Sequence, residues 1–166
     1  TSEANSSATM TDDYIVATQQ LFQDLITKPK LSEKYLRKPP FRFIHDIITN
    51  TMKSSGFPQG LFEGDELNGK LLKEKQDKIA WLSKLIKCLE SVTGEKLNVK
   101  PNKVVAGMEP EFTNEMLQTF ASIAIDVANG KLIMENILND MNNPNKDTEN
   151  DNNMNINMNN LNGNSN

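Results

Sequence analysis

The sequence predicts a single all-α domain, a helical bundle, with polar segments at both ends of the chain. Between residues 10 and 141, apolar side chains recur at three- and four-residue spacing in successive segments, as in amphipathic helices. Glycine and proline separate these segments, and none of them alternates apolar with polar residues long enough to predict a strand. The 166 residues have room for one domain with a sizeable core.

The first helix is expected to begin at Thr11, a residue type that caps helices, with Asp12 and Asp13 in the first turn where negative charge is favourable. Its apolar stripe comprises Tyr14, Ile15, Thr18, Leu21, Phe22, Leu25 and Ile26. Ser32 is expected to cap a short helical turn that runs through Leu36.

A second helix is expected to begin just after Pro40, because proline at the start of a helix presets the backbone and loses no hydrogen bond. It should end near Gly56, and a third should run from about Asp77 to Val92 and stop at Gly94. The inward residues of the second helix are Phe41, Ile44, Ile47, Ile48 and Met52. Those of the third are Ile79, Leu82, Leu85, Ile86 and Leu89.

A fourth helix is expected to begin at Thr113 as its cap, and a last one to follow Gly130. The fourth carries Met116, Leu117, Phe120, Ile123, Ala124 and Val127, and the last carries Leu132, Ile133, Ile137, Leu138 and Met141. Two glycine- and proline-containing connections, 56–70 and 94–112, are expected to be loops.

The composition divides the chain into three parts. Residues 1–9 are small and polar, which indicates a cloning scar or a disordered leader, and residues 10–141 form the predicted domain. Residues 142–166 contain 13 asparagines in 25 positions, so we expect a disordered, low-complexity Asn-rich tail. The sequence has no apolar run of about 18 residues, which predicts no membrane span, and no signal peptide is visible.

Residues suited to catalysis or metal binding are few. With one cysteine, Cys88, and one histidine, His45, the chain cannot form an intramolecular disulfide or a Cys/His zinc site. His45 falls on the apolar face of the second helix and is expected to be a core residue, as is Cys88 on the third. Asp46 points about 100° away round the helix, so it cannot orient the imidazole as in a triad. We predict no catalytic residue, no cofactor and no metal.

The charge of the chain is segregated, although the net charge is only −4. Residues 10–27 carry −3, residues 28–103 carry 16 basic and 9 acidic groups, and residues 104–141 carry −5. The densest basic stretch is 28–42. A fold that gathers these cations would attract an acidic partner, and the alternative is a merely solvated charged face. Because the aromatic residues fall on core stripes, nucleic acid is disfavoured as the partner.

Four stretches carry a resemblance to a known family: "LSEKYLRKPPFRFIHDIIT" (31–49), "GFPQGLF" (56–62), "DKIAWLSKLI" (77–86) and "KPNKVVAGMEPEFTNEMLQ" (100–118). Over roughly residues 12–140 the chain resembles the N-terminal domain of the microtubule-interacting proteins associated with TRAF, which are subunits of intraflagellar transport complex B. The resemblance implies a divergent calponin-homology fold, a compact bundle of helices. It also implies binding to tubulin or microtubules through a basic surface.

The resemblance also implies which residues make that surface. Lys38 and Arg42 match basic positions of the family, Lys100 and Lys103 match a second basic pair, and Met108 stands where the family often has histidine. With two further residues of the basic stretch, the predicted tubulin-binding residues are Lys34, Arg37, Lys38, Arg42, Lys100 and Lys103.

The resemblance places the protein in the cytoplasm on the cytoskeleton, and at the cilium or basal body of a ciliated organism. Other intraflagellar transport proteins and TRAF would bind regions that lie outside this sequence. The alternative function is a protein–protein scaffold domain of a transport or signalling complex without direct tubulin contact. Actin binding is a third option, from fold analogy alone.

Overall fold

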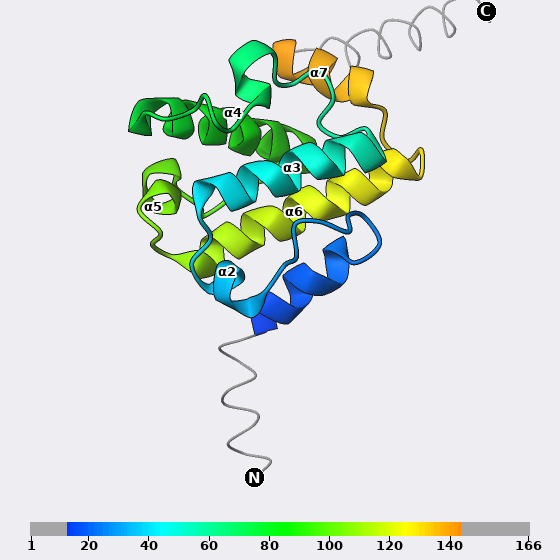
Figure 1. Ribbon diagram of the computed structural model, residues 1–166. Coiled ribbons are helices and arrows are strands. Elements are labelled where there is room, and N and C mark those ends of the chain that lie inside the picture. Colours follow the sequence, from blue (N-terminus) through cyan, green and yellow to red (C-terminus); the bar gives the residue numbers. More distant parts are fainter. Residues whose placement is uncertain (1–12, 144–166) are drawn as a thin grey trace, which may run out of the picture.

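The regular structure of the protein is helical throughout residues 13–143, which are the residues that the computed structural model describes (Figure 1). The expected cap Thr11, the leader 1–9 and the Asn-rich segment from residue 144 onward lie outside the described residues. The elements are a helix over residues 13–22, α2 (Glu33–Arg37), α3 (Phe41–Ser55), a 3-10 helix (Gly64–Leu67), α4 (Lys75–Thr93), α5 (Pro101–Val105), α6 (Pro110–Ala128) and α7 (Met134–Asn142). The all-α prediction is therefore confirmed.

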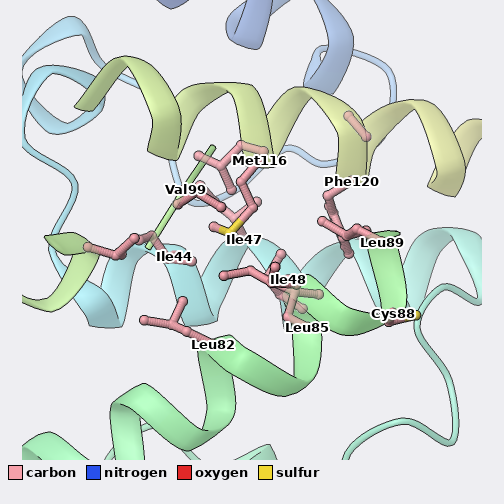
Figure 2. Packing of buried hydrophobic residues seen from close by; sticks show 14 of the residues in the cluster. Ile44, Ile47, Ile48, Leu82, Leu85, Cys88, Leu89, Val99, Met116 and Phe120 are labelled. Atoms are coloured by element: carbon pink, nitrogen blue, oxygen red, sulfur yellow. The ribbon is translucent and has the colours of Figure 1, made fainter. Parts of the chain in front are cut away.

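The core lies between α3, α4 and α6. In Figure 1, α3 and α6 run side by side through the middle of the molecule, with α4 on one side and the helix over residues 13–22 on the other. Figure 2 shows where these helices meet, at Ile44, Ile47, Ile48, Leu82, Leu85, Leu89, Met116 and Phe120. The first helix joins the core through Phe22, whose ring stacks on Phe120 at 6.2 Å between centroids.

Several helices begin or end where their capping residues predicted. Ser32 caps α2, because its hydroxyl accepts a hydrogen bond from the Tyr35 backbone N–H at 3.3 Å. Pro40 is the N-cap of α3, and Gly56 ends that helix in the left-handed conformation with φ 89°. Gly94 ends α4 in the same way with φ 74°. Glycine serves at these ends because it has no Cβ to clash there.

Other expectations were wrong. α6 begins at Pro110, three residues before the expected cap, and Thr113 lies buried inside the helix. Pro110 takes the first helical position, where its missing N–H costs nothing. The two connections predicted as loops contain short helices, the 3-10 helix in the first and α5 in the second. The first helix stops at residue 22, so Leu25 and Ile26 lie in the turn that follows it.

The expected burial pattern also needed adjustment. Met52 and Ile79 are only partly buried, whereas Phe43 and Trp81 belong to the buried core. Within residues 13–143, no helix combines the length and the apolar character needed to cross a bilayer.

Candidate functional site

The double proline of the basic stretch leaves a carbonyl of α2 without a backbone donor. Leu36 lies in the last turn of α2, where carbonyls have no donor within the helix, and neither Pro39 nor Pro40 has an N–H with which to bind its carbonyl in a tighter turn. The side chain of Asn114, fully buried in α6, donates to this carbonyl at 2.8 Å. α6 thereby holds the C-terminal end of α2, where Lys38 follows.

Asn114 also connects α6 with the helix over residues 13–22. Its Oδ1 lies 2.8 Å from the Thr18 hydroxyl, which is completely buried, and its amide donates to the Pro110 carbonyl at 2.9 Å. One turn further along α6, the Gln118 amide donates to the Tyr14 carbonyl at 3.0 Å and to the Thr18 hydroxyl at 3.2 Å. One buried polar network therefore fixes the first helix, α2 and α6 relative to one another.

The segments that carry the predicted basic pairs lie at one end of the bundle. α2, the first turn of α3, and α5 lie together on the left of Figure 1. The stem of Lys38 runs against Gly107, so closely that a Cβ added at Gly107 would lie 2.8 Å from the Lys38 Cε. Gly107 belongs to the same turn as Lys103, whose carbonyl accepts from the Met108 N–H at 2.9 Å. The structure thus brings the segments of Lys38 and Lys103 into contact.

The other predicted residues occupy the same end in different ways. Lys100 is exposed and is the N-cap residue of α5. Lys34 and Arg37 are exposed on α2, and Arg37 forms an ion pair with Glu33 one turn earlier at 2.6 Å. Part of the positive charge of α2 is therefore already compensated within the domain.

Arg42 is exposed at the start of α3, and its side chain lies across Gly69 rather than against the Lys38 turn. A Cβ at Gly69 would lie 2.9 Å from both Cδ and Nε of Arg42, and 3.1 Å from Nδ1 of His45. A side chain at position 69 would therefore require the Arg42 side chain to move. Gly69 therefore sets the path of the Arg42 side chain.

One basic residue of this end was missed by sequence reasoning. The ammonium of Lys78 lies 5.8 Å from the centroid of the Phe41 ring, next to the start of α3. The sequence did contain a signal for Lys78. It precedes Trp81 by three residues, so the two side chains lie on the same side of α4. Trp81 packs edge-on against Phe41 at 5.4 Å between centroids, so Lys78, on the same side of α4, also lies near the Phe41 ring.

His45 and Cys88 are core residues, as expected. His45 is 2% exposed and packs against the rings of both Phe41 and Trp81, at 6.1 and 5.0 Å between centroids. Its Nε2 lies 2.8 Å from the carbonyl of Glu66, which also accepts from the Trp81 indole N–H at 3.2 Å. Because a carbonyl can only accept, Nε2 carries the proton of the neutral ring.

The titration of both groups fits a structural role. Burial lowers the pKa of His45, and this effect outweighs the opposing influence of the Glu66 carbonyl and of Asp46. Burial raises the pKa of the Cys88 thiol to about 12, so it is not a reactive nucleophile at neutral pH. Among the described residues, no three or more His, Cys, Asp or Glu side chains are grouped so that they could hold a metal ion.

Known proteins are similar in sequence to this chain. Residues 14–126 match the family model described as the CH-like domain of the microtubule-binding protein MIP-T3. The chain is 42% identical over 117 residues to TRAF3-interacting protein 1 of Danio rerio, which covers 70% of this chain and 19% of the relative. It is 46% identical over 101 residues to the protein of that name from Mus musculus, covering 61% of this chain and 16% of the relative. The chain thus spans less than a fifth of the length of these relatives.

Proposed function

The chain belongs to the family of microtubule-binding MIP-T3 proteins and carries their calponin-homology-like (CH-like) domain, and from this premise we propose that it binds tubulin through its basic end. We define the basic end by the six predicted residues: Lys34, Arg37, Lys38, Arg42, Lys100 and Lys103. The observation that carries the proposal is the contact between the Lys38 stem and the Gly107 turn, which places Lys38 beside the segment that carries Lys100 and Lys103. The role is binding, without catalysis.

The proposed mechanism is the pairing of several cations with the carboxylates of tubulin, whose tails are rich in glutamate. An exposed ion pair is worth about 0–1 kcal/mol, so single contacts are weak and several must act together. Affinity on the order of micromolar is the consequence, with fast association that salt suppresses. The ion pair of Arg37 with Glu33 makes that residue the weakest contributor of the six.

A charge-reversal variant tests this proposal by co-sedimentation with microtubules. It combines Lys38→Glu, Arg42→Glu, Lys100→Glu and Lys103→Glu, and we expect it to abolish sedimentation while far-UV circular dichroism stays unchanged. The matched control makes the same change in net charge at four exposed lysines outside the basic end: Lys53, Lys87, Lys96 and Lys131. The control should bind far better than the test variant. Sedimentation of the test variant at the wild-type level would refute the proposal.

A scaffold role without direct tubulin contact is the second candidate. The internal pairing of Arg37 with Glu33 favours it, because this ion pair compensates part of the positive charge of the basic end. Association with a protein complex that survives about 0.5 M salt and removal of the tubulin tails would support this role. At that salt concentration electrostatic attraction is screened over well under 10 Å. In either case we place the domain on the microtubule cytoskeleton, at the cilium or basal body where the organism is ciliated. Transport-complex partners would bind elsewhere in the longer protein.

A further inference from the structure

We propose that the turn between α5 and α6 adds an apolar contact to the basic end, in which Met108 packs against an apolar side chain of an acidic segment of tubulin. This inference rests on the proposed function. It concerns the turn over residues 106–109, which we call the Met108 turn. The side chain of Met108 is 51% exposed in this turn.

The backbone of the Met108 turn is closed by hydrogen bonds and includes one residue in a strained conformation. Gly107 has φ 73°, and Glu109 has φ 52°, the one positive φ of a non-glycine residue within residues 13–143. The turn is closed by hydrogen bonds from the Gly107 N–H to the Val104 carbonyl at 3.0 Å and from the Met108 N–H to the Lys103 carbonyl at 2.9 Å. Strained conformations of this kind persist where the surrounding structure fixes them, and they cluster at binding sites.

The same turn fixes a cation beside Met108. The Lys38 stem occupies the space that a side chain at Gly107 would need, with Cε, Cγ and Cδ at 2.8, 3.4 and 3.7 Å from the Cβ position. Lys103 supplies the carbonyl that holds the Met108 N–H. The residue that carries this exposed apolar side chain therefore follows the glycine on which Lys38 packs and is bound through its backbone to Lys103.

The charges around Met108 identify the occupant. Lys38, Lys100 and Lys103 come from the two segments that meet here, against Glu109 within the turn and Glu111 in the first turn of α6. An acidic segment complements this surface, and an unbranched thioether adapts to different apolar side chains. A single exposed apolar residue is ordinary on a protein surface. Here the strained backbone and the fixed lysine give it a defined position within a charged surface.

The size of the effect follows from the exposure. About half of the Met108 side chain is exposed and could become buried on binding. Burying that half should increase the affinity for microtubules roughly three- to tenfold. Apolar contacts are not screened by salt, so this factor should be similar at every ionic strength. The contributions of Lys38 and Lys103 should instead fade as salt rises.

Co-sedimentation of the chain with microtubules over a salt series tests the inference. We expect Met108→Ala to weaken binding roughly three- to tenfold by a constant factor, and Met108→Leu to retain most of the affinity. The matched control is Ile133→Ala, since Ile133 is 58% exposed on a different part of the surface, and it should bind as the wild type does. Thermal unfolding verifies that each variant is folded.

The outcomes separate the two proposals. Wild-type binding by Met108→Ala, together with loss of binding by the four-residue charge reversal, would overturn the apolar contact and leave the proposed function standing. An effect of Met108→Ala that vanishes at high salt would also overturn it, because the contact would then be electrostatic. Binding by the charge-reversal variant at the wild-type level would overturn the proposed function itself.

Discussion

Replacing Asn114 with alanine should destabilise the protein and release α2 from the rest of the bundle. The substitution removes the donor of the Leu36 carbonyl, which Pro39 and Pro40 cannot replace, and one of the hydrogen-bond partners of the buried Thr18 hydroxyl. A stranded buried carbonyl costs about 1–3 kcal/mol and a lost neutral hydrogen bond about 0.5–1.5 kcal/mol. Together these predict a loss of about 1.5–4.5 kcal/mol in the free energy of unfolding.

Guanidinium denaturation followed by circular dichroism measures this loss. Asn114→Asp keeps the size of the side chain but removes both N–H donors, so it should be at least as damaging. Asn139→Ala, at an exposed position of α7, serves as the control and should change the unfolding free energy by less than about 0.5 kcal/mol.

Two further results bear on the reasoning. Backbone amides of α2 should exchange with solvent faster in Asn114→Ala, and microtubule affinity should fall because Lys38 ends α2. If both Asn114 variants unfold at wild-type denaturant concentrations, another donor satisfies the Leu36 carbonyl, and the account of the double proline is wrong.

Three other predictions concern single positions. Because burial holds the pKa of His45 below its usual 6.5, the folded state binds this proton less readily than the unfolded state. The unfolding free energy should therefore fall as the pH drops below about 6.5 and level off below the folded pKa; equal slopes in denaturation series of the wild type and His45→Gln would contradict this. Glu109→Asn should raise the unfolding free energy by about 0.5–1 kcal/mol, because asparagine tolerates the left-handed conformation better, and should strengthen microtubule binding by removing a negative charge. Glu109→Gln separates the two effects, since it removes only the charge. Gly69→Ala should displace the Arg42 side chain and weaken microtubule binding while the protein stays folded, and in an Arg42→Ala background it should weaken binding little further; equal losses in both backgrounds would show that Gly69 does not act through Arg42.

Much of the fold could be predicted because local chemistry determines it. The ends of α3 and α4 follow from Pro40, Gly56 and Gly94, which carry the same conformational meaning in almost any context. The start of α6 could not be settled in this way. Thr113 is a suitable cap by residue type, but in the structure it lies buried inside α6. A proline such as Pro110 is common both in loops and at the first helical position, so its presence did not identify the start of the helix.

The candidate site was less accessible from the sequence than the fold. The sequence supplies the basic residues, but the path of Arg42 depends on Gly69 and that of Lys38 on Gly107, each far away in the chain. Asn114 was missed because asparagine usually signals caps and turns. A usable signal did exist, since two consecutive prolines after a helix require that its last carbonyls find donors elsewhere.

The double proline and Asn114 also restrict how this sequence can change in evolution. The residues are more than seventy positions apart, yet a replacement of Pro40 by any residue with an N–H would supply a new candidate donor to Leu36 and make Asn114 more dispensable. A replacement of Asn114 while the prolines remain has no such remedy. Homologues should therefore lose the Asn114 amide only after, or together with, Pro40. The Leu36 carbonyl thus constrains the order of substitutions in this family.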